Sequence, residues 1–162
     1  MNLFKKLFGG KGKRPPNDEG PTPTRGLNLQ YQPIPENGPK FAKQFVDAVS
    51  NNENKELDYG VDTLDFVDHF LQRFRDEGLN VNDFAETIFV AGAYVGEVMI
   101  KNNQGVWIKQ EDANLPDGVS MMSIVIKLPN GNVVDPIAKA FKRFHYGESD
   151  SIRYFYQVFT NE

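Results

Sequence analysis

The segment "DFAETIFVAGAYVGEVMIKN" (residues 83–102) decides the fold. Its apolar side chains recur every three or four residues over the whole stretch, which is the spacing of one face of an α-helix. The repeating positions are Phe84, Ile88, Ala91, Val95 and Met99. The pattern predicts one long helix that begins after a polar cap at Asn82 or Asp83.

Two glycines, Gly92 and Gly96, stand inside this predicted helix. A glycine in a helix interior costs about 1 kcal/mol relative to alanine, so other contacts must offset roughly 2 kcal/mol. Residues four apart share one helix face, and a face without side chains lets a neighbouring element come close. A phosphate-binding loop is the alternative, but Glu97 follows directly and would repel a phosphate. We therefore expect a packing helix, with neighbouring backbone filling the space at both glycines.

Three more amphipathic helices are predicted, two before this segment and one after it. Residues 39–52 and 62–78 carry apolar side chains at helical spacing, and Gly78 is a stop signal for the second of them. Residues 136–144 have the same pattern and follow Asp135, which is suited to cap a helix.

The sequence also predicts a small sheet. The apolar period changes to two at residues 106–110, 121–129 and 132–135, and Asn130-Gly131 is a strong hairpin signal. Residues 151–160 fit either a helix or a strand, and the polar run "ESDS" before them favours the helix.

Together these elements predict one α+β domain over residues 39–162, with four or five helices packed on a small antiparallel sheet. Residues 1–38 are predicted to form a flexible, basic arm rich in Pro and Gly, because seven of the ten prolines lie between residues 9 and 39. The alternative for residues 27–35 of this arm is an extended segment that lies on the body of the domain. Residues 3–8 combine Leu and Phe with two lysines. Two interpretations stay open for them: a mobile terminus, or weak contact with an anionic membrane surface or a partner groove.

Charge and composition argue against several classes of function. The net charge is −4, yet residues 1–26 carry six basic residues against two acidic ones, so the rest of the chain carries −8. Such a body repels nucleic acid. No apolar run reaches the roughly 18 residues that a membrane span needs. The chain has no cysteine, which excludes thiolate zinc sites and cysteine nucleophiles and fits a cytoplasmic location.

The strongest candidate for a binding surface is a run of acidic residues opposed only by Lys55. Its members are Glu53, Glu56, Asp58, Asp62, Asp65 and Asp68. Their spacing does not fit a calcium-binding loop. Two interpretations remain: an ordinary solvated loop and helix start, or a surface that attracts a basic protein partner. Trp107, which fits a core position on its strand, is the second candidate contact for that partner.

Catalysis has little support, because the chain has only two histidines and neither is accompanied by a nucleophile at a suitable spacing. We therefore predict a protein that is not an enzyme and that holds no metal and no cofactor. The alternative is a small-ligand binder or hydrolase whose pocket gathers Tyr94, Glu97, Trp107 and Arg143. Independently of that alternative, we expect Glu97 to be partly buried and paired with Lys142 or Arg143, because a buried acid needs such a partner.

Four motifs in order, "GAYVGEV", "GVWI", "VVDP" with "AKAFKRF", and "GESDSIRYFY", resemble a class of small bacterial cytoplasmic domains with no assigned activity. The resemblance spans roughly residues 56–160. It implies the α+β fold and a bacterial cytoplasmic setting, and it implies no catalytic residue. Small acidic proteins without cysteine also look like immunity proteins that neutralise toxins of interbacterial competition. The predicted function is therefore a non-catalytic interaction module, with an immunity protein as its most concrete form.

Overall fold

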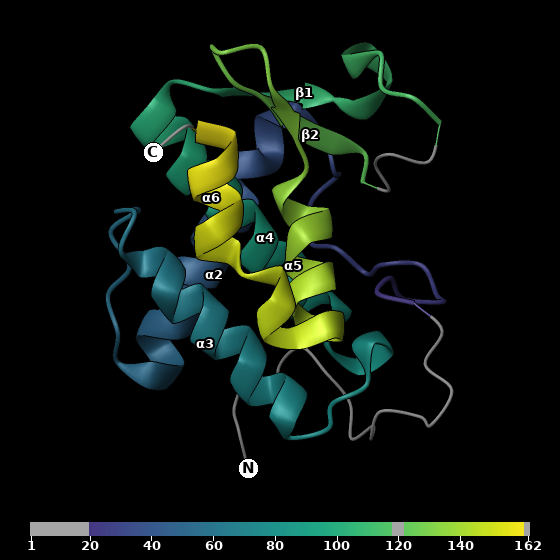
Figure 1. Ribbon diagram of the computed structural model, residues 1–162. Helices are drawn as coiled ribbons and strands as arrows, with labels where there is room; N and C mark the ends of the chain where they lie inside the picture. The colour runs from purple at the N-terminus through teal and green to yellow at the C-terminus, as the bar shows by residue number, and fades with distance from the viewer. Residues whose placement is uncertain (1–19, 118–121, 161–162) are drawn as a thin grey trace.

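A computed structural model describes residues 20–117 and 122–160 and shows an α+β fold within them (Figure 1). The helices are α2 (Gly38–Glu53), α3 (Thr63–Asp76), α4 (Val81–Asn103), α5 (Pro136–Tyr146) and α6 (Ile152–Thr160). The strands are β1 (Val106–Lys109), β2 (Ile124–Lys127) and β3 (Val133–Val134), paired antiparallel in the order β1-β2-β3. Short 3₁₀ turns are η1 (Pro35–Asn37), η2 (Gln110–Ala113) and η3 (Gly147–Asp150). The predicted fold class is confirmed, and α6 settles residues 151–160 as helical.

Helix α4 lies at the centre of the fold. In Figure 1 it runs behind α5 and α6, while β1 and β2 lie across one end of the helices. Every residue from Thr87 to Met99 is buried. A helix that is apolar all round is stable only when other elements cover every side of it. Helices α2 and α5 supply most of that cover, and the sheet covers the end near Gly96.

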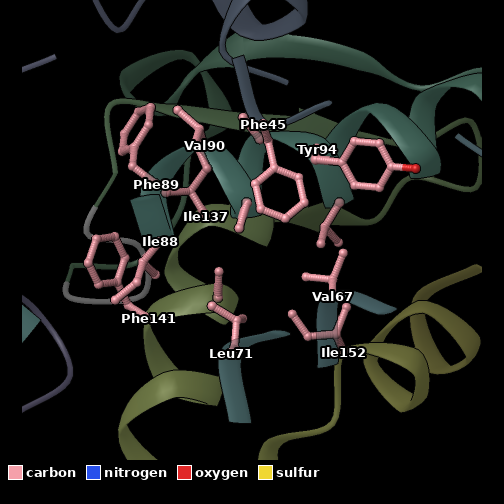
Figure 2. Close-up of a cluster of buried hydrophobic side chains, with 14 of the residues drawn as sticks. Phe45, Val67, Leu71, Ile88, Phe89, Val90, Tyr94, Ile137, Phe141 and Ile152 are labelled. Atoms are coloured by element: carbon pink, nitrogen blue, oxygen red, sulfur yellow. The ribbon is translucent and has the colours of Figure 1, made fainter. Parts of the chain in front are cut away.

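The core is a single cluster of apolar side chains contributed by all five of these helices and the sheet. Figure 2 shows Phe45 of α2, Val67 and Leu71 of α3 and Ile137 of α5 around the α4 side chains. Phe70 contacts Phe45 edge to face, with 5.1 Å between the ring centroids. Such aromatic pairs stabilise the core beyond the area that they bury.

The ends of the helices follow local capping chemistry. The Asp135 carboxylate accepts a hydrogen bond from the Ala138 amide (2.8 Å), so the predicted cap of α5 is confirmed. Gly78 has a φ of +78° just after α3, as its predicted stop role requires. The predicted cap of α4 at Asn82 or Asp83 is wrong, because the Asn80 side chain accepts from the Asn82 amide and the helix begins earlier, at Val81.

The two glycines of α4 lie against different neighbours. A methyl group on Gly92 would come within 2.5 Å of the Cα of Ile137 and 3.0 Å of the Pro136 carbonyl oxygen, so the backbone of α5 fills that space as expected. At Gly96 the expectation of neighbouring backbone is wrong. There the Trp107 ring and the Ile126 side chain fill the space, because the sheet packs its side chains on this part of α4.

Residues 22–33, which we call the strap, lie along the body of the domain before α2. The Arg25 guanidinium makes two hydrogen bonds of 2.8 Å to the Glu86 carboxylate of α4, and the Asn28 amide donates a third. The apolar strap residues packed against the core are Leu27, Leu29 and Tyr31. Part of the segment that we expected to be a flexible arm therefore contacts the domain. The boundary at residue 39 stays a prediction, and residues 3–8 lie outside the described residues.

The close approach of α5 makes a specific prediction about Gly92. Gly92→Ala should lower the free energy of unfolding by about 1–3 kcal/mol, because the added methyl group overlaps the α5 backbone. A decrease in the free energy of unfolding would be informative, because helix propensity alone favours alanine over glycine by about 1 kcal/mol. Urea unfolding followed by circular dichroism measures the change. Gly26→Ala is the matched control, because nothing lies within 4 Å of a methyl group there. Equal stability of the two variants would contradict the packing role.

The Arg25–Glu86 ion pair predicts a dependence of stability on pH. Burial alone would raise the pKa of the Glu86 carboxyl, but hydrogen bonds from the Arg25 guanidinium and the Asn28 amide outweigh burial and lower it. A lowered carboxyl pKa stabilises the folded state above the ordinary pKa, and this contribution is lost as the pH falls through the lowered value. Glu86→Gln should therefore melt below the wild type at neutral pH. The gap should close as the pH falls below about 4.3, the ordinary pKa of Glu. Thermal melts across this range test the prediction, and a gap that is independent of pH would refute it.

Candidate functional site

Three of the predicted acidic residues come together at a hollow in the surface. The hollow has a volume of about 460 Å³ and lies at the loop between α2 and α3. The acidic residues that line it are Asp58, Asp62 and Asp65; Val61 and Phe66 are partly buried apolar residues beside them, and Lys55 is the one basic residue. The structure thus combines negative charge with apolar surface at one place, which no single sequence motif indicated.

Local hydrogen bonds fix the loop that forms this hollow. The Asp58 carboxylate accepts from the Gly60 amide (2.9 Å), and Tyr59 takes a left-handed φ of +64°. The Tyr94 hydroxyl accepts from the Tyr59 amide (3.0 Å) and lies 2.7 Å from the Thr63 hydroxyl. Burial raises the pKa of Tyr94 although its hydrogen bond with Thr63 lowers it, so this hydroxyl stays protonated. The central helix therefore holds the hollow in shape.

Two of the six predicted acidic residues form ion pairs in which the carboxylate side chain is largely buried. The Glu53 carboxylate lies 2.6 Å from the Arg73 guanidinium. The Asp68 carboxylate lies 2.8 Å from the Arg143 Nε, and the side chain of Arg143 is only 4% exposed. The Gln72 side-chain oxygen accepts a second hydrogen bond from Arg143 (2.6 Å). A largely buried charge needs this degree of pairing, so Glu53 and Asp68 hold elements of the fold together. Their part in partner binding stays a prediction.

Asp68 also fixes the C-terminal helix. Its two carboxylate oxygens accept from the backbone amides of Ile152 (2.8 Å) and Arg153 (3.1 Å) at the start of α6. Negative charge at a helix N-terminus is stabilising, because the first amides have no partner within the helix. Asp68, which we predicted for partner binding, thus joins α3 to α6.

The acidic residues around the hollow stay accessible. Arg153 lies 3.4 Å from Asp62 and 3.2 Å from Asp65, but these two carboxylate side chains are 98% and 57% exposed. Exposed ion pairs of this kind contribute little to stability, because water screens them. Glu56 and Asp58 are exposed as well. We refer to Glu56, Asp58, Asp62 and Asp65 as the acidic surface.

Glu97 and Trp107 form a buried polar pair. The indole Nε1 of Trp107 donates a hydrogen bond of 2.8 Å to the Glu97 carboxylate, which is 5% exposed. We expected Lys142 or Arg143 as the partner of Glu97, and this prediction is wrong. Arg143 is engaged by Asp68, and the tryptophan of the adjoining strand reaches Glu97 instead.

The Trp107 ring is held between two helices. It fills the space at Gly96 of α4 and also the space at Gly38, the first residue of α2. A methyl group on either glycine would overlap the ring. The sequence analysis did not identify Gly38, and the only signal was a glycine directly before Pro39. Trp107 is therefore a packing residue, and we do not include it in the acidic surface.

The residues of the alternative ligand pocket have different neighbours in the structure. Tyr94 faces the loop before α3, Glu97 faces Trp107, and Arg143 faces Asp68. Two further hollows are lined by other residues. One of about 600 Å³ lies beside the strap, and one of about 290 Å³ lies between β3, α5 and α6. Neither is lined by any member of the predicted pocket.

The described residues contain neither a metal-binding cluster nor a helix that could span a membrane. Within residues 20–117 and 122–160, no three acidic or histidine side chains come together in a way that could hold a metal ion. In the same part of the chain, no helix has both the length and the apolar character that a membrane crossing requires. In comparisons with known proteins, no family model, curated protein or solved structure matches this chain.

The Glu97–Trp107 pair can be tested through stability. Trp107→Phe keeps an aromatic ring but removes the donor, so the buried carboxylate loses its hydrogen bond. We expect the free energy of unfolding to fall by about 1–3 kcal/mol. Urea unfolding followed by circular dichroism measures it. Tyr154→Phe is the control, because it removes a hydroxyl from a side chain that is 66% exposed and should change stability by less than about 0.5 kcal/mol. A Trp107→Phe variant as stable as this control would show that the pair contributes nothing.

Proposed function

We propose that the protein is a non-catalytic interaction module whose acidic surface binds a basic protein partner. The observation that supports this proposal is the placement of exposed carboxylates around a hollow with apolar side chains in its wall. Val61 and Phe66 offer contact to the aliphatic part of a lysine or arginine, while the acidic residues attract its charged end. A protruding basic side chain of a partner is thus the group that suits this hollow.

Long-range electrostatics favour the same class of partner. The chain after residue 26 carries a net charge of −8, which speeds the approach of cationic proteins and repels nucleic acids. Arg153 already lies across Asp62 and Asp65, so the acidic surface is compatible with a guanidinium group. The partner's basic residue would add to this arrangement at Glu56 and Asp58. Their carboxylates accept hydrogen bonds from the Ser50 hydroxyl and the Gly60 amide, respectively.

In its most concrete form, the module is an immunity protein that neutralises a basic toxin in a bacterial cytoplasm. This form rests on charge complementarity: an acidic surface that covers a basic active site or nucleic-acid groove would block access to it. The small-ligand or hydrolase alternative has less support. Its four residues lie in three separate contacts, and each contact joins elements of the fold.

A pair of matched charge reversals tests the proposal. The first variant combines Glu56→Lys with Asp62→Lys on the acidic surface. The control combines Glu111→Lys with Asp112→Lys, two exposed acidic residues of η2 that lie outside that surface. Both variants change the net charge equally. We expect the wild type and the control to capture the same basic protein from the native cell, and the first variant to lose it, with melting temperatures almost unchanged.

Three outcomes would contradict the proposed function. The first variant could retain the partner, which would place the interface elsewhere. Both variants could lose it equally, which would mean that only net charge matters. Finally, mass spectrometry could find no basic protein enriched by the wild type. Adding salt is a further check, because attraction between exposed charges weakens as the ionic strength rises.

A further inference from the structure

We propose that the strap is a displaceable cover, which opens as one unit when the Arg25–Glu86 ion pair breaks and then exposes apolar surface of α2 and α4. This inference is independent of the acidic surface. It rests on where the strap is held, how loosely the rest of it packs, and what lies beneath it.

Most polar contacts between the strap and the body are made by two residues of the first turns of α4, Glu86 and Asn82. The Glu86 carboxylate accepts two hydrogen bonds from Arg25 and one from the Asn28 amide, each of 2.8 Å. Its side chain is 14% exposed, so water competes only weakly for these bonds. Arg25 also donates to the carbonyl oxygen of Asn82, one turn earlier on α4. Loss of the Glu86 charge would therefore weaken three hydrogen bonds at once and leave those to Asn82 as the remaining polar contacts of this end of the strap.

The remainder of the strap is packed less closely. A hollow of about 600 Å³ lies beside it, lined by strap residues together with Phe89 of α4 and Met122. Dispersion contacts are lost wherever such a gap separates two surfaces. The strap forms no part of the sheet, whose described strands are β1, β2 and β3. A segment without a ladder of backbone hydrogen bonds opens at a lower free energy than the helices and strands of the core.

Beneath the strap lies fully buried aromatic surface. The Tyr31 ring meets Phe41 edge to face, with 5.7 Å between the ring centroids, and Phe41 meets Phe89 at 4.9 Å. Phe41 and Phe89 are 0% and 2% exposed. Opening of the strap would remove Tyr31 and uncover this side of both helices. The strap is followed by η1, which begins at Pro35. The Trp107 ring packs on Gly38 just after η1 and keeps the start of α2 in place.

Hydrogen–deuterium exchange of the full chain tests the proposal. Glu86→Gln and Arg25→Gln each remove one side of the ion pair. We expect the amides of residues 22–33 to exchange at least about tenfold faster in both variants, since hydrogen bonds to charged groups are among the strong ones. Amides of α4 and α5 should still exchange far more slowly than those of the strap, because they open only when the whole domain unfolds. An apolar dye should fluoresce more strongly with both variants, because opening exposes aromatic surface.

Asp47→Asn is the matched control. It breaks an ion pair with Lys43 of the same charge type, but the two side chains are 53% and 69% exposed and lie on α2 alone. This variant should exchange like the wild type. Arg25→Gln guards against misfolding of Glu86→Gln, because it leaves every residue of the body unchanged. Unchanged exchange of the strap in Arg25→Gln would overturn the proposal. Strap amides that exchange as slowly as those of α4 and α5 would also overturn it, because the strap would then open only with the whole domain.

Discussion

The structure depends on how closely other elements approach helix α4. A helix that is buried all round must be covered on every side, and side chains of ordinary size would keep its neighbours away. At Gly92 the missing side chain lets the α5 backbone lie against the helix, and at Gly96 it makes room for the Trp107 ring. The two glycines thus bring a helix and the sheet to one central helix, and the helix propensity that they lose is offset by this packing.

The sequence was sufficient for features that neighbouring residues determine. The period of the apolar residues located the helices, Asp135 capped α5, and Asn130-Gly131 joined β2 to β3. Features that depend on distant pairs could not be predicted. Nothing local distinguishes Gly38 from any glycine before a proline, yet it accommodates an indole sixty-nine positions later. Glu97 likewise has its donor across a turn on the sheet, while the helical arginine that seemed suited to it pairs with α3.

The run of acidic residues shows why charge in a sequence does not by itself locate a site. Asp68 and Asp65 lie three apart on one helix face, yet Asp68 is enclosed by Arg143 and the first amides of α6 while Asp65 remains largely in water. The difference lies in what packs against each position. A carboxylate that faces a neighbouring helix needs hydrogen-bond partners within the protein. A carboxylate that faces solvent is hydrated by water and does not need them.

The same reasoning bears on the residues that most resemble an active site. Tyr94, Glu97 and Arg143 are buried polar groups, and such groups often mark chemistry. Here each one fixes a different element to the core: Tyr94 holds the loop before α3, Glu97 holds β1, and Arg143 holds α3 to α5. A buried polar pair is satisfied in only one arrangement, so each contact prevents its element from sliding. Because these groups are used in this way, the partner site that we propose lies on the outside of the molecule, where the acidic surface combines exposed charge with a hollow.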